Sequence, residues 1–233
     1  MIIIRSLLFN LFLYSWTSFI AILFLPFLLL TNQILLTKIV GNIWAYGLKY
    51  GLLYICKIKV EVRGKENLPE RPFIVASKHQ SALETIMFYT VFSDIVFILK
   101  KELLFLPIYG IYLARMGMIT IDRKGGASSI KKMLKDAKKA LNLGRTLIIY
   151  PEGTRGRVGE KIPYKPGVAA IYLHTHKMVV PLALNSGEFW PKGSFLKYPG
   201  TCVFEIKPPL PANLPKDEFM ERLEQAIEAG ISV

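Results

Sequence analysis

The sequence predicts an α/β fold, a mixed sheet flanked by helices, preceded by an N-terminal apolar helical segment that anchors the chain in a membrane. Three observations predict this class. Seven short apolar runs have the length and composition of strands and are interspersed with helical patterns. A long uncharged stretch lies near the N-terminus. The 233 residues suffice for one well-buried domain and leave little for a second.

The N-terminal stretch between Arg5 and Lys38 contains no charged residue. A bilayer-spanning helix needs about 20 apolar residues, so this stretch is longer than one span requires. Pro26 interrupts it and is expected to kink or break a helix. Two arrangements remain open: one tilted span, or two shorter helices that form a hairpin in one leaflet. A cleaved signal peptide does not fit, because the run is too long and no small-residue cleavage site follows it.

We expect residues 1–57 to form the membrane anchor and an interfacial segment, and residues 58–233 to form the α/β domain. Residues 39–59 mix aromatic side chains with lysines and glycines, a pattern typical either of headgroup contacts or of a core helix. Nearly all basic residues follow the anchor. The positive-inside rule therefore places the α/β domain on the cytoplasmic side of the inner or cytoplasmic membrane.

Strands are expected where short runs rich in β-branched residues end at Gly, Pro or polar residues. The expected strands are residues 59–63, 73–77, 94–99, 118–121, 147–150, 178–184 and 202–206. Helices are expected to begin at Ser81, Ser128 and Gly167, and a last helix runs from Lys216 to Ala229.

The formal charge of +13, together with 52% apolar residues, is unusual for an ordinary soluble domain. It indicates contact with anionic lipid, an acidic carrier or nucleic acid. Nucleic acid is not an expected partner, because no binding module is recognisable and the positive charge accompanies a membrane segment. Residues 128–143 predict an amphipathic helix. Its lysine face either is solvated or contacts an acidic carrier or anionic headgroups.

No metal site or thiol chemistry is expected. His174 and His176 are two positions apart, point to different sides of a helix and have no third ligand nearby. Cys56 and Cys202 show neither metal nor redox spacing and are too few for a disulfide framework.

The stretch SKHQSALET, residues 77–85, places His79 and Glu84 between two apolar runs. One interpretation is structural, because Ser81 and Glu84 fit the S-x-x-E pattern of a capping box. The other is catalytic, because imidazole suits general-base work near neutral pH and a carboxylate orients it. One carboxylate is not expected to serve easily both as a full capping partner and as the partner of His79.

Three more stretches follow in order. They are KKELLFLPIYGIYLARMGMITIDR at 100–123, YPEGTR at 150–155, and VVPLALNSG at 179–187, the last preceded by YKPG at 164–167. Together with SKHQSALET, they resemble the glycerolipid acyltransferase family, specifically the 1-acylglycerol-3-phosphate acyltransferases, over about residues 60–190. A set of motifs in fixed order is more specific than any one of them.

The resemblance implies an enzyme that transfers a fatty acyl chain to the sn-2 hydroxyl of lysophosphatidic acid and so forms phosphatidic acid. The donor is a thioester of coenzyme A (acyl-CoA) or of an acyl carrier protein, and no cofactor is implied. Alternatives are another lyso-lipid or glycerol 3-phosphate as acceptor, or a non-catalytic basic protein that binds membrane lipid. A base with a carboxylate partner favours the enzyme, because lipid binding alone needs neither.

The resemblance also implies the catalytic residues. The family's H-x4-D block places the histidine at His79 and its carboxylate at Glu84, which replaces the family's aspartate and is one methylene longer. Direct attack by the acceptor hydroxyl is expected, since no G-x-S-x-G context surrounds Ser81.

The remaining motifs imply the substrate contacts. Arg123, Arg155 and Lys101, the last with Lys100 as an alternative, are expected to bind the phosphate. Glu152, Gly153 and Thr154 form the substrate-site loop, in which Glu152 is expected to position Arg155 or a glycerol hydroxyl. Pro181 either lines the acyl or donor pocket or is a strand proline at an edge or bulge.

Overall fold

A mixed seven-stranded sheet forms the centre of the computed structural model, which describes residues 1–30 and 34–231. Its strand order is β1-β7-β6-β2-β5-β3-β4, and every neighbouring pair is parallel except β6 and β7. The strands are β1 (Ile58–Arg63), β2 (Ile74–Ser77), β3 (Ile95–Lys100), β4 (Ile119–Ile121), β5 (Thr146–Ile149), β6 (Val179–Leu184) and β7 (Gly200–Ile206). The five strands from β6 to β4 therefore end at the same edge of the sheet.

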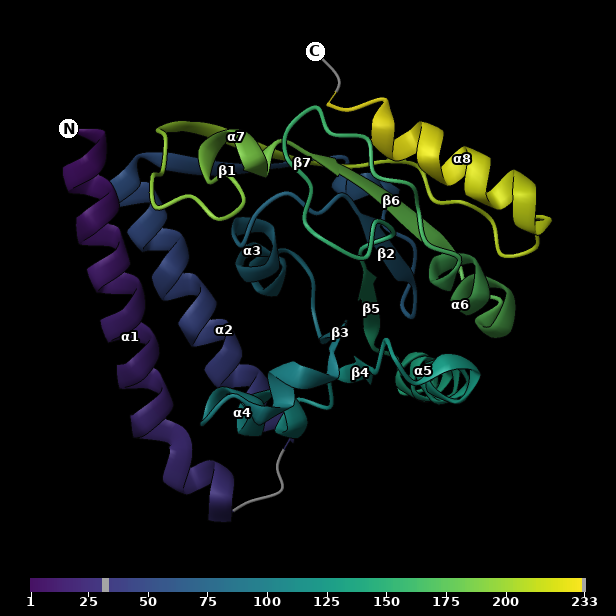
Figure 1. Cartoon of the computed structure of the whole chain (residues 1–233), viewed down its shortest axis with the longest axis horizontal. Coiled ribbons are helices and arrows are strands. Elements are labelled where there is room, and N and C mark those ends of the chain that lie inside the picture. Colours follow the sequence, from purple (N-terminus) through teal and green to yellow (C-terminus); the bar gives the residue numbers. More distant parts are fainter. Residues whose placement is uncertain (31–33, 232–233) are drawn as a thin grey trace.

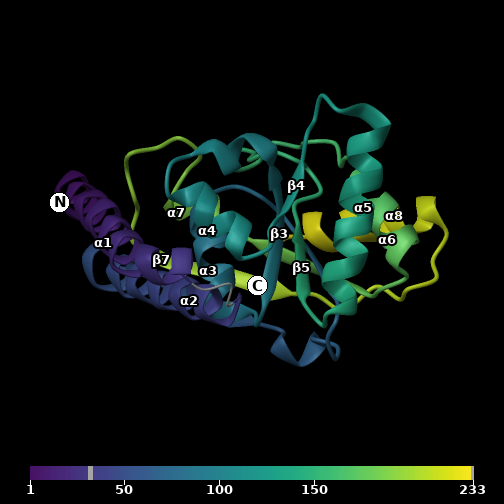
Figure 2. The ribbon, with the colours of Figure 1, turned by 90° about the horizontal axis from the view of Figure 1, so that it is seen from below.

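Helices cover both faces of this sheet. They are α1 (Ile2–Leu30), α2 (Ile34–Gly51), α3 (Leu83–Val91), α4 (Tyr109–Arg115), α5 (Gly126–Asn142), α6 (Gly167–Thr175), α7 (Ser186–Phe189) and α8 (Lys216–Glu228). Figure 2 shows α5, α6 and α8 on one side of the strands and α1 to α4 on the other. The expected α/β class with a mixed sheet is confirmed.

The expected elements agree closely with the observed ones. All seven expected strands are present, and their ends differ by at most two residues. The helix expected at Gly167 begins there, whereas α3 begins at Leu83 and α5 at Gly126, each two residues from its expected start. Helices α4 and α7 were not expected. Helix α5 buries Met133, Ala137 and Leu141, as the amphipathic pattern predicts.

Helices α1 and α2 form a hairpin at the left of Figure 1. The indole Nε1 of Trp16 donates to the backbone carbonyl of Trp44 at 3.1 Å, and Nε1 of Trp44 donates to the Thr17 hydroxyl at 3.0 Å. A Cβ atom at Gly47 would lie 2.3 Å from the Trp16 ring, so glycine permits this close approach.

Of the kink or break expected at Pro26, the break is wrong. Helix α1 continues through Pro26 to Leu30. A proline removes one backbone donor, but the helix-favouring residues around it keep their own bonds, so the helix continues. The hairpin expected within residues 6–37 therefore has different arms in the structure. Its first arm is the whole of α1, and its second arm is α2, which extends well beyond residue 37. By length and composition, α1 is able to cross a membrane.

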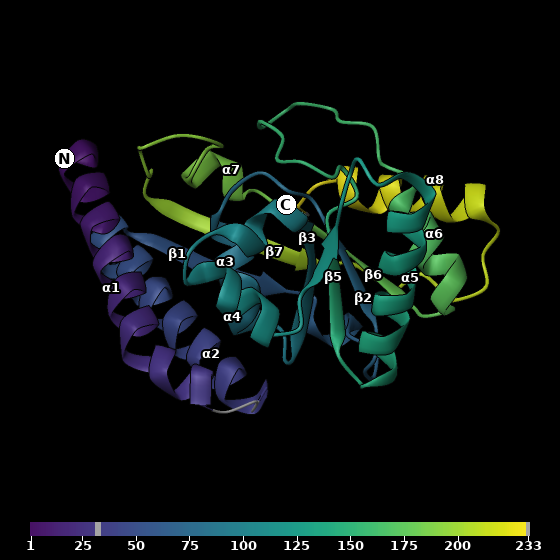
Figure 3. The same ribbon diagram turned by 60° about the horizontal axis from the view of Figure 1, so that its bottom comes forward.

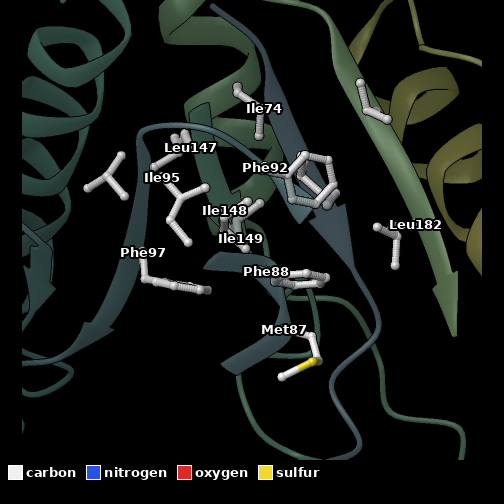
Figure 4. Close-up of a cluster of buried hydrophobic side chains, with 14 of the residues drawn as sticks. Ile74, Met87, Phe88, Phe92, Ile95, Phe97, Leu147, Ile148, Ile149 and Leu182 are labelled. Carbon is white, nitrogen blue, oxygen red and sulfur yellow. The ribbon is translucent and has the colours of Figure 1, made fainter. Parts of the chain in front are cut away.

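A cluster of aromatic and aliphatic side chains fixes α3 against the sheet (Figure 4). Phe88 of α3 lies 5.6 Å from Phe92 and 6.4 Å from Phe97 of β3, measured between ring centroids. Ile148 of β5 and Leu182 of β6 are fully buried in the same cluster. This packing holds the first turn of α3 beside the carboxyl end of β2, where the candidate site lies.

Candidate active site

The predicted site residues follow strands that end at one edge of the sheet. His79 follows β2, Lys101 follows β3, Arg123 follows β4 and Glu152 follows β5. In open α/β sheets this edge, at the carboxyl ends of parallel strands, is where ligands bind. The loop between β5 and α6, which carries PEGTR, is the green trace at the top of Figure 1.

His79 and Glu84 are in direct contact. Nδ1 of the imidazole lies 2.8 Å from Oε1 of Glu84, whose side chain is fully buried. The longer glutamate thus reaches the ring from the first turn of α3. In a neutral imidazole, a donor at Nδ1 leaves Nε2 as the acceptor.

Four donors surround the Glu84 carboxylate. Besides His79, the backbone N–H groups of Gln80 and Ser81 donate to Oε1 at 2.9 and 2.8 Å. The hydroxyl of Ser186, which follows β6, donates to Oε2 at 2.6 Å. One oxygen of Glu84 thus accepts from Ser81 and from the imidazole together, which is half of the capping box. The full box does not form, because the Ser81 hydroxyl accepts from the Leu83 N–H instead of the Glu84 N–H, in agreement with the expectation that Glu84 would not easily fill both roles.

Tyr150 supports the other side of the imidazole. Its ring stacks on His79 with centroids 3.8 Å apart and planes at 12°. Its hydroxyl lies 3.0 Å from the hydroxyl of Thr85. Burial raises the pKa of Tyr150, so the phenol stays neutral. Sequence reasoning missed this residue, although an aromatic directly before PEGTR at a strand end was a signal.

Glu152 holds the backbone of His79. Its Oε2 accepts from the His79 N–H at 3.0 Å, whereas its buried Oε1 has no hydrogen-bond partner among the described residues. Burial raises the pKa of Glu152 to about 7, against lowering by the His79 bond and the Lys78 charge. The protein partner of Glu152 is therefore the His79 backbone and not Arg155, and the alternative role of positioning a glycerol hydroxyl stays a prediction.

The cationic residues lie on neighbouring loops. Arg123 donates through Nη2 to the backbone carbonyl of Gly153. A Cβ atom at Gly153, whose φ is +67°, would lie 3.3 Å from Lys165 and 4.0 Å from Arg123, so these three residues are neighbours. Lys165, from YKPG, was not among the predicted phosphate ligands.

The remaining substrate-site residues are accessible at the same edge. Arg155 and Thr154 are exposed on the loop after β5. Lys101 lies 3.7 Å from Asp122 and is half exposed, at 52%. These positions keep three cationic side chains available to an anionic ligand, and the phosphate roles of Arg123, Arg155 and Lys101 stay predictions.

Pro181 lies inside the sheet. It is buried in β6, opposite Ala76 of β2, and its carbonyl accepts from the Lys207 N–H at 2.9 Å. Because β6 lies between β7 and β2, the alternative of a proline at a sheet edge is wrong. The pocket role of Pro181 stays a prediction. Within residues 1–30 and 34–231, no group of three or more His, Cys, Asp or Glu is placed to hold a metal ion.

The fold and the histidine–carboxylate pair define a class, and comparison with known proteins gives it a name. Residues 59–185 match the family model described as Acyltransferase. The chain belongs to this acyltransferase family.

Individual relatives have more specific names than the family model. The chain is 37% identical over 178 residues to a 1-acyl-sn-glycerol-3-phosphate acyltransferase of Pseudomonas aeruginosa, covering 76% of this chain and 69% of that one. It is 30% identical over 200 residues to the human 1-acyl-sn-glycerol-3-phosphate acyltransferase alpha, covering 84% and 69%. The crystal structure of a 1-acyl-sn-glycerophosphate (LPA) acyltransferase from Thermotoga maritima shares the fold, with a TM-score of 0.79, 24% identity and coverage of 98% and 95%.

Proposed function

We propose that this protein is a 1-acylglycerol-3-phosphate acyltransferase that forms phosphatidic acid from lysophosphatidic acid and a fatty acyl thioester. The observation that carries the proposal is the 2.8 Å contact between His79 and Glu84 at the carboxyl edge of the sheet. Membership of the acyltransferase family and the relatives' shared activity support it. Coenzyme A or an acyl carrier protein supplies the thioester, and no further cofactor is needed.

His79 acts as the general base. Its Nε2 removes the proton of the sn-2 hydroxyl while the hydroxyl oxygen attacks the thioester carbonyl carbon. The new C–O bond forms, the C–S bond breaks, and the imidazolium returns the proton to the leaving thiolate. Glu84 keeps Nδ1 protonated and stabilises the positive charge that develops on the ring.

Neither nearby serine competes as a nucleophile. Ser81 is fully buried, and its hydroxyl accepts the backbone N–H of Leu83 at 3.1 Å. The buried Ser186 hydroxyl donates to Glu84. Direct attack by the acceptor hydroxyl agrees with both environments.

The acceptor phosphate binds to the cationic loops. Arg123 and Arg155 are exposed at the same edge as His79, and Lys165 lies beside Gly153. A guanidinium offers two parallel donors to phosphate oxygens, which a lysine does not. Lys101 contributes a further positive charge on the loop after β3.

The α1–α2 hairpin holds the enzyme on its lipid substrate. Many large apolar side chains on its surface are exposed, and only 11% of the most apolar 18-residue stretch of α1 is buried. Examples from the two arms are Leu7, Leu11, Phe19, Ile22 and Phe27, and Ile39, Ile43 and Tyr46. Such a surface is unfavourable in water and is stable in lipid. The basic α/β domain then faces the cytoplasm.

Both ends of this hairpin lie beside the α/β domain. Ser6, near the start of α1, accepts the backbone N–H of Lys197 at 2.9 Å, and a short π-helix, Leu52–Cys56, joins the end of α2 to β1. A hairpin that enters and leaves one leaflet keeps both ends cytoplasmic, whereas a single span would put Ile2 on the far side. A cysteine at Ile2, in a variant that lacks Cys56 and Cys202, should resist an impermeant thiol reagent until cells are opened. Labelling from outside would exclude the hairpin.

The activity itself is tested with purified protein in vesicles. Lysophosphatidic acid, lysophosphatidylcholine and glycerol 3-phosphate are each combined with acyl-CoA and with an acylated carrier protein. We expect phosphatidic acid from lysophosphatidic acid, and we expect Arg155→Ala to raise the KM for that acceptor while leaving the donor KM unchanged. Arg155→Lys should recover little. Turnover of another acceptor in preference to lysophosphatidic acid would contradict the proposal.

A further inference from the structure

The last residue of α8, Glu228, contacts two segments of the candidate site. Its Oε2 accepts from Nζ of Lys78 at 2.5 Å, and its Oε1 accepts from the hydroxyl of Tyr164 at 3.0 Å. Lys78 directly precedes His79, and Tyr164 belongs to the loop that also carries Glu152 and Arg155. One carboxylate therefore bridges the two chain segments that supply the base and the substrate-site loop.

The position of Glu228 is fixed by the packing of α8. Phe219, Leu223 and Ile227 of this helix are buried, and the Phe219 ring stacks on Tyr172 of α6 with centroids 3.8 Å apart. Figures 1 and 3 show the end of α8 beside the loop between β5 and α6. A carboxylate at the end of a packed helix is a fixed point to which the His79 segment and the β5–α6 loop are both bound.

The two partners of Glu228 are suited to hold it. The Lys78 side chain is 13% exposed and that of Glu228 is 28% exposed, so water screens their pairing less than at an open surface. Burial and the Glu228 charge raise the pKa of Tyr164, which keeps the phenol as a donor.

We propose that Glu228 is a positioning residue for acyl transfer, which aligns the His79 segment with the β5–α6 loop by holding Lys78 and Tyr164 on its two oxygens. This inference rests on the proposed function. It adds a residue outside the motifs that resemble the family, 149 positions along the chain from His79.

The ion pair between Lys78 and Glu228 also affects the pKa of Glu152. The charged groups that act on Glu152 are Lys78 after β2, Glu84 on α3 and Glu228 on α8, and His79 acts on it through its backbone N–H. The Lys78 charge lowers the pKa of Glu152 and the Glu228 charge raises it, so the ion pair between them balances two opposed effects. Lys161, Glu221 and Glu224 share the surface depression beside Glu228.

Two substitutions disturb this balance in opposite directions. Glu228→Gln keeps the shape and removes the negative charge, so the pKa of Glu152 should fall. Lys78→Met removes the positive charge, so the pKa should rise. If the ion pair only stabilised the fold, both variants would lose stability, and the pKa of Glu152 would not shift in opposite directions.

The kinetic test compares Glu228→Gln with Glu221→Gln, an exposed control on the same helix. We expect Glu228→Gln to lower kcat about tenfold, the scale of a small misplacement of catalytic groups, and Glu221→Gln to leave it unchanged. Glu228→Asp keeps the charge and should recover part of the loss. Equal kcat in wild type and Glu228→Gln would overturn the proposal.

The pH test does not require activity. Melting temperatures of Glu228→Gln and Lys78→Met are measured from pH 4.5 to 8, each also in a Glu152→Gln background. We expect the titration near pH 7 to move down in the first variant and up in the second, and to vanish with Glu152→Gln. Shifts in one direction only, or shifts that persist without Glu152, would overturn the link between the Lys78–Glu228 ion pair and the pKa of Glu152. If wild type lacks acyltransferase activity but shows these shifts, the proposed function fails and the link stands.

Discussion

Two carboxylates flank His79 in contrasting surroundings. Glu84 contacts the imidazole and receives four hydrogen bonds on its two oxygens. Among the described residues, Glu152 accepts a hydrogen bond from the His79 backbone N–H on one oxygen, and its second oxygen is buried without a hydrogen-bond partner. The difference indicates separate tasks: Glu84 is arranged to balance charge on the ring, and Glu152 fixes the chain from which the ring extends.

Removing the ring gives the largest expected effect. His79→Ala should lower turnover about a hundredfold to ten-thousandfold, the usual contribution of a general base. The backbone bond to Glu152 survives this change, so the melting temperature should stay close to that of wild type. His174→Ala, an exposed histidine on α6, is the matched control. Near-normal turnover of His79→Ala would exclude the mechanism.

Substitutions of Glu84 distinguish its effect on the His79 ring from a role in capping alone. Glu84→Gln can still accept from the ring but has no charge to stabilise the imidazolium, so kcat should fall about tenfold to a hundredfold. Glu84→Asp keeps the charge at shorter reach and should retain more activity than Gln or Ala. Activity and melting temperature are measured together. A loss of activity that only tracks the loss of stability across all three variants would leave Glu84 a capping residue.

Glu152→Gln should have the smallest effect on turnover, because its amide oxygen can still accept the His79 N–H. Its effect is on stability. The pKa of Glu152 rises from 4.5 to about 7 on folding, so the folded state holds the proton more tightly and stability falls as pH rises through this window. The shift corresponds to about 3 kcal/mol.

Denaturant unfolding at pH 4.5 and pH 8 measures this difference. Wild type should lose about 3 kcal/mol relative to Glu152→Gln over the interval, since the amide does not titrate. Parallel pH dependence in both proteins would show that Glu152 is not the buried group that titrates.

The sheet could be predicted from the sequence because its strands are short, apolar and β-branched. The pairing of His79 with Glu84 was equally accessible, since the two residues lie five positions apart. The break expected at Pro26 was wrong because a local rule about proline was applied to a long helix whose other residues favour continuation.

The rest of the site depends on contacts between distant segments. Ser186 is 102 positions from Glu84 and Glu228 is 150 from Lys78, and no local pattern indicates such pairs. The stacking of Tyr150 on His79 and the contact of Glu152 with the backbone required the strand order, which places β5 next to β2. Motifs indicate which chemical groups the site contains, whereas the strand order determines which of these groups are in contact.

The tautomer of His79 tests the central claim most directly. The chain contains three histidines, so nitrogen-15 NMR of histidine-labelled protein gives few imidazole signals, and the spectrum of His79→Gln assigns them. The account predicts that neutral His79 carries its proton on Nδ1, shared with Glu84, and has an unprotonated Nε2 ready to accept the hydroxyl proton. A neutral His79 protonated on Nε2 would contradict it, because that nitrogen could not act as the base.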